Sequence, residues 1–560
     1  MATSTDKPAD VVVIGLGAGG GTAVLPLAEA GLDVVGLEAG GRYMPRDFPA
    51  DEIRNDTRNW LGRVKVNSEV PTQRLSAAHP TTPAVAPARM MNAVGGTSIH
   101  WTCQSWRLME WDFKARSETI RRYGAAALPA GTTLTDWPVD YAEMEPWYDR
   151  VEYFHGVSGT SGANPFEGPR ARPYPLPPLR RTGWTEFMRS AANQLEWHPF
   201  AGPAAIRSEP YNGMNACEYH GFCGFGGCHV SAKASTSVSS IPLAEKSGKL
   251  KVVEHARVFE ITVDSDGRVN GVKYLKGNAE HVQPAKVVLL AGYAYENTRL
   301  LLLSRSNAYP NGLSNNHGQV GRHYMSHGLR SVAVQGLFPG RKLNRYGGSG
   351  SQWTAIDDWD ADNFDHTGLG FIGGGSLSAG NELKPLGAAR NTPPSIPRWG
   401  PAWKAWLKAN ANSVGTVSAQ VNAIPYEGFF LDLDPTTRDP QGFPVIRITF
   451  DLTDNERRAA LFLQQKARDW LLEAGASETW TTPPAPIHVT THAYGGTRMG
   501  DDPDVNVTDR WCFSHEVPNL GVLGASNFPT SGGRNPTETV MALAFRTAGH
   551  LVETWSDRTG

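Results

Sequence analysis

Three glycines near the N-terminus stand at a spacing that suits the binding of a pyrophosphate. Residues 15–20 read GLGAGG and fit G-x-G-x-x-G, directly after an apolar run at 10–14 and directly before a helical stretch. Gly15 permits a tight turn, and Gly17 lets the backbone approach a phosphate. Gly20 lets the helix pack closely on the strand, so that the helix N-terminus faces the phosphate charge. The pattern predicts a dinucleotide-binding turn.

An acidic residue follows at the position where a ribose would lie. Glu38 ends a second apolar run at 32–37, and a carboxylate there can accept hydrogen bonds from the ribose hydroxyls. The alternative is a structural turn that binds no ligand, since turns are often rich in glycine. With the strand, the helix and the acid all in place, we favour dinucleotide binding.

Three later segments favour FAD over NAD as the dinucleotide. Residues 94–98 (VGGTS) form a second loop of small residues that could approach a flavin ring. Residues 287–300 resemble the strand, turn and helix that close FAD sites, and the segment 524–526 (GAS) precedes another Gly/Pro loop. Together they indicate a chain that returns several times to one extended cofactor.

The surrounding patterns predict a doubly wound α/β fold of two domains. The strand–helix–strand opening predicts a parallel sheet. The FAD-binding domain is expected to span 1–327 with 486–560, interrupted by excursions around 105–210, and the substrate domain to span 328–485. Further expected elements are a β-hairpin at 251–275, strands at 287–291, 445–450 and 520–523, and helices at 297–304 and 536–555, with an irregular Pro-rich stretch at 160–210.

The composition excludes several classes of protein. A chain of 560 residues with 40% hydrophobic and 19% charged residues is ordinary globular material. Its formal net charge of −2 lacks the basic field of a nucleic-acid binder. The N-terminus is polar, and no stretch is apolar enough to span a bilayer. We therefore expect a cytoplasmic protein with no nucleic-acid or membrane partner. The sequence leaves its oligomeric state open.

A group of cysteines carries a conflicting signal. Cys217, Cys223 and Cys228 lie close together with His220 between them, and thiolates so placed can bind an iron–sulfur cluster. The spacing lacks the compact C-x2-C-x2-C run and fits no common zinc finger. We favour cysteines that pack a Gly-rich loop, and we predict no metal site.

Over nearly its whole length the sequence resembles the glucose–methanol–choline (GMC) oxidoreductases. The resemblance rests on the N-terminal glycine motif, the loop at 94–97, and the C-terminal segments 492–500 (HAYGGTRMG) and 535–537 (NPT). It implies an FAD-binding Rossmann-like domain, with a parallel sheet, helices and a β-meander, and an α+β substrate domain built on an antiparallel sheet. The segment 100–103 (HWTC) looks like the branch of pyranose oxidases, bacterial glycoside 3-oxidases and gluconate 2-dehydrogenases.

The resemblance also implies roles for particular residues. His492 holds the position of the family's catalytic base, and Asn535 that of its His or Asn partner. In some pyranose oxidases the residue matching His100 is bonded to the flavin, and here both a covalent and a non-covalent FAD stay open. The residues expected to bind FAD are Gly15, Gly17, Gly20, Glu38, Gly95, Gly96, Thr97, His100, Trp101, Thr102, Val258, Ala291, Ala525, Pro536 and Thr537.

The function that follows is an FAD-dependent sugar or glycoside oxidase. It would oxidise a ring secondary hydroxyl, at C3 or C2, to a keto-sugar and reduce O2 to H2O2. One alternative, favoured by the cysteine group, is the catalytic subunit of a sugar or polyol dehydrogenase that passes electrons to a cytochrome or quinone. Another is an FAD-containing lyase. The expected partners are a small sugar or glycoside and O2 or another electron acceptor.

Overall fold

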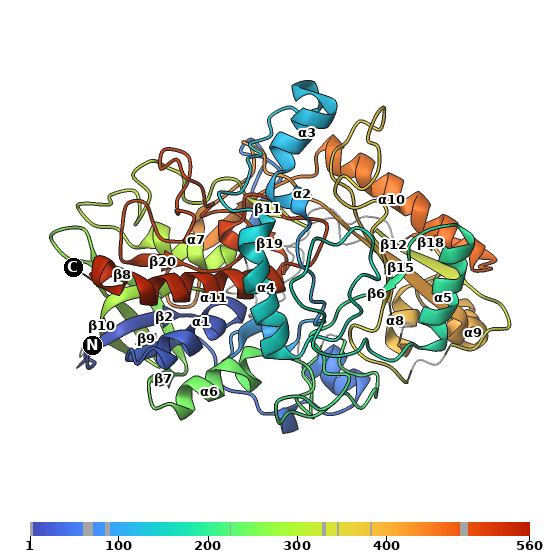
Figure 1. Cartoon of the computed structure of the whole chain (residues 1–560), viewed down its shortest axis with the longest axis horizontal. Helices are drawn as coiled ribbons and strands as arrows, with labels where there is room; N and C mark the ends of the chain where they lie inside the picture. Colours follow the sequence, from blue (N-terminus) through green and yellow to red (C-terminus); the bar gives the residue numbers. More distant parts are fainter. Residues whose placement is uncertain are drawn as a thin grey trace.

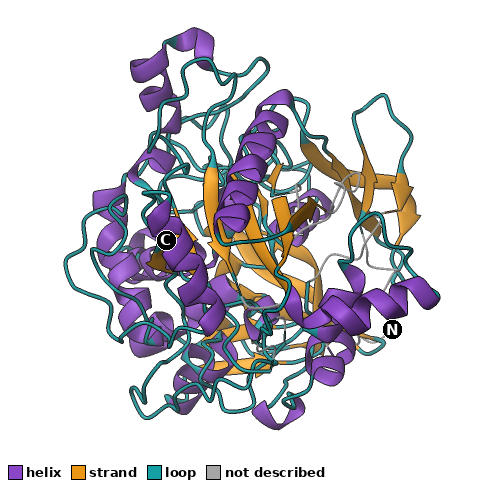
Figure 2. Cartoon of the chain, turned by 90° about the vertical axis from the view of Figure 1, so that its right-hand side faces the viewer, coloured by secondary structure: helices purple, strands orange, loops and turns teal. Residues whose placement is uncertain are grey.

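A computed structural model describes residues 4–59, 71–83, 90–224, 226–327, 332–343, 346–380, 384–481 and 491–559. The two chain ends lie near one another beside one sheet, and a second sheet lies on the far side of the molecule (Figure 1). From the side, strands gather in the middle and most helices lie at the margin (Figure 2). Within the described ranges, no helix is both long and apolar enough to cross a bilayer.

The N-terminal glycine motif lies in an eight-stranded sheet whose central strands are parallel. Along the sheet the order is β7-β3-β2-β10-β9-β8, and β1 and β20 also pair with β10. Strands β8, β9 and β10 form the antiparallel meander. The strands are β1 (Ser4–Thr5), β2 (Ala9–Ile14), β3 (Val34–Leu37), β7 (Leu250–Val253), β8 (Ala256–Val263), β9 (Val269–Lys276), β10 (Ala279–Leu290) and β20 (Leu520–Val522).

Both faces of the parallel strands are buried, one under helices and the other under the meander strands and a helix, which is why these strands are continuously apolar. Val11, Val12 and Val13 of β2 are fully buried. The helix α1 (Ala18–Glu29) packs beside α11 (Thr537–Glu553). The other helices are α2 (Glu110–Phe113), α3 (Ala115–Tyr123), α4 (Tyr141–His155), α5 (Gly183–Gln194), α6 (Ser240–Lys246), α7 (Ala294–Leu303), α8 (Pro385–Arg390), α9 (Pro401–Asn410), α10 (Asp454–Glu473) and α12 (Trp555–Thr559).

A second, antiparallel sheet has six strands in the order β18-β12-β15-β14-β13-β6. Helices α5 and α10 pack on it, and Trp184 and Trp470 lie in the core between them. Its strands are β6 (Phe200–Ala201), β12 (Val332–Leu337), β13 (Thr354–Ile356), β14 (Gly375–Ala379), β15 (Val414–Val421) and β18 (Glu478–Thr481). The expected fold class, a Rossmann-like domain with a meander plus a domain on an antiparallel sheet, is confirmed.

Two smaller sheets complete the fold. One has the strands β4 (Thr72–Arg74), β5 (Thr82–Pro83), β16 (Phe430–Arg438) and β17 (Pro444–Thr449). The other is a two-stranded antiparallel pair of β11 (Met325–Ser326) and β19 (Ala493–Tyr494). This pair brings the segment after β11 beside the segment before β19, and it positions the candidate site.

The stretch expected to be irregular, 160–210, contains a helix. Thr182 caps α5: its hydroxyl accepts from the N–H of Thr185, and the Thr185 hydroxyl accepts from the N–H of Thr182. These reciprocal bonds satisfy donors that a helix start leaves unpaired. The prolines of this stretch lie before Thr182 or after Gln194, so none of them interrupts the helix.

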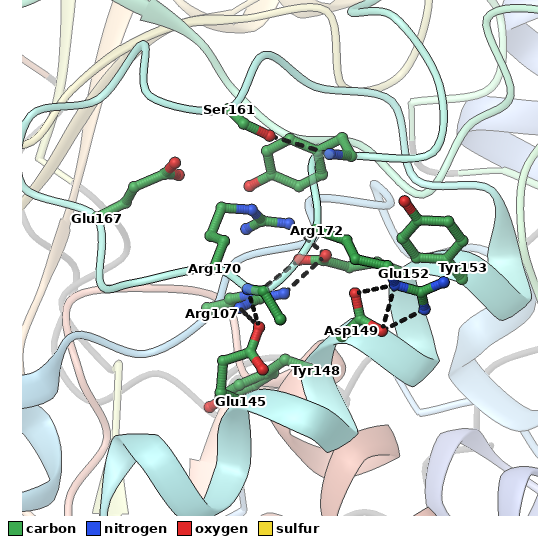
Figure 3. A network of polar contacts seen from close by, with 12 residues as sticks. Arg107, Glu145, Tyr148, Asp149, Glu152, Tyr153, Ser161, Glu167, Arg170 and Arg172 are labelled. Atoms are coloured by element: carbon green, nitrogen blue, oxygen red, sulfur yellow. Dashed lines mark hydrogen bonds and ion pairs between the residues drawn. The ribbon is translucent and has the colours of Figure 1, made fainter.

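A buried network of charges ties α4 to the chain beside it (Figure 3). Arg107 donates to both carboxylate oxygens of Glu152, at 2.8 and 2.9 Å, and to Glu145 at 3.0 Å. Arg170 also pairs with Glu152, whose side chain is fully buried. Burial, and after it the charge of Glu152, raises the pKa of Glu538 to about 8. Glu538 is therefore neutral at neutral pH, and two cations face two anions.

Arg107→Met should destabilise the protein by about 3 kcal/mol, because it leaves buried carboxylate charge without its main partner. Denaturant unfolding followed by tryptophan fluorescence measures this. The control is Arg121→Met, which removes the surface pair of Arg121 with Glu118 and should leave the stability nearly unchanged. Equal effects of the two substitutions would contradict the role given to the network.

Candidate active site

A long cavity of about 1360 Å³, part of it open to solvent, runs along the carboxyl edge of the parallel strands. It begins at the turn after β2 and continues past the segment after β10 to the start of α11. The predicted residues that line it are Gly15, Gly17, Glu38, Gly96, Thr97, Trp101, Val258, Ala291, Ala525, Pro536 and Thr537. Segments far apart in sequence thus meet around one elongated space.

The glycines of the first turn serve two different needs. Gly15 has φ +87°, and a Cβ there would lie 2.7 Å from the Ala291 carbonyl oxygen. A Cβ on Gly20 would lie 2.0 Å from the Gly15 oxygen, so Gly20 is required by the close contact of helix and strand and does not line the cavity. A Cβ on Gly17 would meet nothing closer than the Gly96 Cα at 4.0 Å. The fold itself therefore does not require glycine at position 17, and a ligand in the cavity would.

Glu38 holds the turn as well as facing the cavity. Its two carboxylate oxygens accept from the N–H groups of Leu16 and Gly40, both at 3.0 Å. The carboxylate is thus fixed by the backbone where it faces the cavity.

The second glycine loop approaches the first. Gly95 and Gly96 have φ of +103° and +50°, which allow the chain to turn into the short 3-10 helix at Gly96–Ile99. Gly96, Thr97 and Trp101 line the cavity, whereas Gly95 does not. The Trp101 indole donates to the Ala234 carbonyl at 2.7 Å, which fixes its ring.

The structure separates His100 and Thr102 from the residues that line the cavity. His100 follows the 3-10 helix, and its N–H donates to the Thr97 carbonyl at 3.1 Å. The backbone carbonyl of Thr102 accepts from the Ser351 hydroxyl. Neither is among the lining residues, so their assignment to the cofactor remains a prediction.

From this placement we expect non-covalent FAD. Trichloroacetic acid precipitation of the purified protein should leave all the flavin in the supernatant. His100→Ala should bind as much FAD as the unaltered protein. A yellow pellet that turns colourless in His100→Ala would instead identify His100 as a covalent attachment site.

Several cavity residues were not foreseen from the sequence. Met90, Met91, Tyr293 and Glu296 line the space along with Arg257, the neighbour of the predicted Val258. Tyr293 has φ +84°, an unusual backbone conformation for a residue with a side chain. No spacing rule points to these positions. Arg257 reaches the cavity on β8, Tyr293 and Glu296 at the start of α7, and Met90 and Met91 on the segment before the second glycine loop.

His492 and Asn535 come together beside the cavity, and neither is itself among the residues that line it. The Asn535 amide Nδ2 lies 3.3 Å from His492 Nε2. The flanking residues Thr491 and Ala493, and Pro536 after Asn535, line the cavity. Burial lowers the pKa of His492 to about 4, so its ring is neutral at pH 7. A neutral imidazole in this place can accept a proton from a bound hydroxyl.

The segment of Asn535 is anchored by a buried arginine. Arg534 donates to Asp360 at 3.0 Å and to Asp357 at 2.5 Å, and both carboxylates are fully buried. It also donates to the Arg107 carbonyl at 2.8 Å. Because Asp357 directly follows β13, these bonds fix Asn535 relative to the antiparallel sheet.

A second histidine, absent from the sequence-based set, contacts His492. His327 Nδ1 lies 3.2 Å from His492 Nδ1, and the Gln420 amide lies close to both rings. The residues are neighbours because β11 ends before His327 and β19 begins after His492. No local pattern predicts this pairing. His488, which the sequence favours as an ordinary loop or strand histidine, lies outside the described residues.

The cysteine segment forms a packed loop. Cys217, Cys223 and Cys228 form no disulfide bond within the described part of the chain. Lys233 donates to the carbonyl oxygens of Cys223 and Gly226, both at 2.8 Å. Among the residues that the structure describes, no group of three or more His, Cys, Asp or Glu could hold a metal ion.

Comparisons with known proteins agree with this geometry. Residues 430–544 match the family model described as GMC oxidoreductase. The gluconate 2-dehydrogenase flavoprotein of Pantoea cypripedii is 32% identical over 99% of this chain and 95% of its own length. The 2-methyl-1,2-propanediol dehydrogenase of Mycolicibacterium austroafricanum is 29% identical over 100% of this chain and 97% of its own.

The fold has a counterpart among solved structures. Pyridoxine 4-oxidase superposes with a TM-score of 0.62, covering 97% of this chain and 99% of that one at 15% identity. The shape of the cavity fits FAD: it is long, its first turn gives a close approach at Gly17, and Glu38 is positioned for a ribose. The chain belongs to the GMC oxidoreductase family and is an FAD-dependent enzyme that acts on the CH–OH groups of sugars or alcohols.

Proposed function

We propose that the chain oxidises a secondary hydroxyl of a sugar, glycoside or sugar acid, at C2 or C3, to a ketone. The observation that carries this proposal is the His492–Asn535 pair, 3.3 Å apart at the cavity. The C–H bond of the carbinol carbon breaks with its electron pair, and the O–H bond gives up its proton. Bound in the cavity, FAD supplies the acceptor for the hydride.

The residues of the chain divide the remaining work. His492 takes the hydroxyl proton on Nε2, as a general base. Asn535 donates its amide N–H to the substrate oxygen and cannot itself take the proton. The half-buried setting of this pair limits water near the developing charge, which strengthens both hydrogen bonds. Gly17, Glu38 and Gly96 bind the cofactor at a distance from the reaction.

For the electron acceptor we favour a quinone or an electron-transfer protein. The two relatives reported above are both named dehydrogenases, and one is named for gluconate, a sugar acid. The second candidate is an oxidase, favoured by the HWTC segment at 100–103, which looks like that of pyranose oxidases. In the oxidase, O2 takes two electrons and two protons and leaves as H2O2.

Product and acceptor assays test these proposals together. The holoenzyme would be incubated with D-gluconate, D-glucose or methyl β-D-glucopyranoside, and with air, ubiquinone-1 or ferricyanide. We expect a product two hydrogens lighter, with a ketone carbon in its NMR spectrum. Turnover with ubiquinone-1 or ferricyanide that far exceeds turnover in air would support a dehydrogenase. Stoichiometric peroxide in air would establish the oxidase instead, and an aldehyde from C–C cleavage would support a lyase.

The low pKa of His492 also determines how the rate of flavin reduction should change with pH. Because burial holds it at about 4, the ring is unprotonated throughout the neutral range. Protonation of His492 should therefore not lower the rate of flavin reduction between pH 8 and pH 6. It should fall as the pH drops through about 4, where Nε2 becomes protonated. Stopped-flow absorbance across this range measures the profile, and a fall already centred near pH 7 would contradict it.

A further inference from the structure

We propose that His327 is a positioning residue that keeps the proton of neutral His492 on Nδ1 and thereby leaves Nε2 free to act as the base. The inference deepens the proposed function and rests on it for its catalytic meaning. The hydrogen-bond geometry around the two rings carries the argument.

The hydrogen-bond partners of His327 Nε2 show which nitrogen of this ring is protonated. Its Nε2 lies 2.9 Å from the Gly532 carbonyl oxygen and 3.1 Å from the Ser531 hydroxyl. A carbonyl oxygen can only accept. The Ser531 hydroxyl accepts from the Ala423 N–H and donates to the Ala423 carbonyl, both at 2.8 Å, so it also accepts from the ring. Nε2 of His327 therefore carries the proton.

The other ring nitrogen of His327, Nδ1, is unprotonated. Neutral imidazole has one N–H, so Nδ1 of His327 is a bare acceptor. Burial, and after it the neighbouring His492, lowers the pKa of His327 well below its ordinary value, which keeps the ring neutral. Three groups lie near this nitrogen: the Gln420 amide at 2.5 Å, the Tyr494 hydroxyl at 3.2 Å and His492 Nδ1 at 3.2 Å. The unprotonated Nδ1 has a single lone pair, so it accepts from one of these groups at a time.

The unprotonated Nδ1 of His327 determines which nitrogen of His492 carries the proton. The Nδ1 atoms of the two rings are 3.2 Å apart. If both were bare, two lone pairs would face each other at hydrogen-bond distance in a buried place. A proton on His492 Nδ1 replaces that repulsion with an N–H···N bond. Nε2 of His492 is then bare, and it accepts from the Asn535 amide 3.3 Å away.

The contact between the two histidines also stabilises His492 after it has taken up the substrate proton. When His492 takes the hydroxyl proton on Nε2, both of its nitrogens carry a proton and the ring is cationic. The bare Nδ1 of His327 then accepts a hydrogen bond from a charged donor, and such bonds are stronger than neutral ones. His327 is not among the residues that line the cavity, so in this proposal it acts through His492.

A competing arrangement exists and can be distinguished. The Gln420 amide nitrogen lies 2.9 Å from His492 Nδ1, and a bond donated there would leave the proton on Nε2. His492 would then donate to the substrate oxygen rather than accept from it. Long-range 1H–15N NMR of holoenzyme labelled with 15N-histidine separates the two tautomers, and the His492 signals are assigned by their absence in His492→Ala.

We expect a protonated Nδ1 and a bare Nε2 on His492 in the holoenzyme. A protonated Nε2 would overturn the inference. This readout needs no substrate, so it decides the tautomer even if the proposed reaction is wrong.

A pair of shape-matched variants tests the kinetic consequence. His327→Asn and His327→Leu shorten the side chain equally, but only Asn retains an acceptor where Nδ1 stood. Anaerobic stopped-flow with D-gluconate and methyl β-D-glucopyranoside measures flavin reduction. We expect the Asn variant to stay within about tenfold of the unaltered enzyme and the Leu variant to fall about a hundredfold or more, the scale of a lost general base.

The outcomes separate the two proposals. Equal rates for His327→Asn and His327→Leu, with the His492 tautomer unchanged in both, would refute the role of His327 and leave the proposed function intact. An unaltered enzyme whose flavin no hydroxyl compound reduces would refute the proposed function. In that case the NMR result alone decides the inference.

Discussion

Replacing His492 by alanine should slow flavin reduction by at least about a hundredfold, the usual effect of removing a general base. His492 is the titratable side chain that adjoins Asn535 at the cavity, and its Nε2 is the atom placed to accept the hydroxyl proton. Asn535 cannot replace it, because an amide nitrogen has no basic lone pair. Anaerobic stopped-flow absorbance with a saturating substrate measures the rate constant directly.

His323→Ala provides the control for His492→Ala. His323 is also buried, and burial lowers its pKa to about 3. Its ring bonds to Thr133 and Gln319, and it does not line the cavity. This variant should reduce its flavin at nearly the original rate. Near-normal reduction in His492→Ala would remove His492 from the mechanism.

Gly17→Val should yield a folded protein that is largely empty of FAD. Gly17 has φ −70°, which valine adopts without strain. A Cβ there meets no protein atom closer than 4.0 Å, so the fold tolerates the side chain. The added methyl groups would occupy the space where the backbone approaches the pyrophosphate. The ratio of flavin to protein absorbance after purification measures the loss.

Gly428→Val is the matched control for this substitution. Gly428 is exposed, and a Cβ on it would likewise meet nothing within 4 Å. It lies outside the cavity lining and should retain a full complement of FAD. Full occupancy in Gly17→Val would show that the dinucleotide lies elsewhere.

The parallel sheet and its glycine turn could be predicted from the sequence because their signals are local. The apolar run at 10–14 became β2 (Ala9–Ile14), and the expected helix at 536–555 became α11 (Thr537–Glu553). A buried parallel strand is continuously apolar, and a turn that needs glycine has few alternatives. These constraints act within a few residues of the chain.

The parts that were not predicted depend on long-range pairing. His327 lies 165 positions from His492 and meets it through the two-residue strands β11 and β19. Strands this short leave no periodic pattern. The segment 100–103 shows a related difficulty. Trp101 lines the cavity, whereas His100 and Thr102 are not among the lining residues, and Cys103 has φ +64°. The residue types of this segment do not predict that division.

The measurement that tests the central claim most directly is an anaerobic absorbance titration of the purified holoenzyme. D-gluconate, D-glucose and methyl glucosides would be added in turn while the flavin bands are followed. We expect at least one of them to bleach these bands in one-to-one stoichiometry and to yield its keto product. A flavin that remains oxidised with every hydroxyl compound, in a protein with a full complement of FAD, would contradict it.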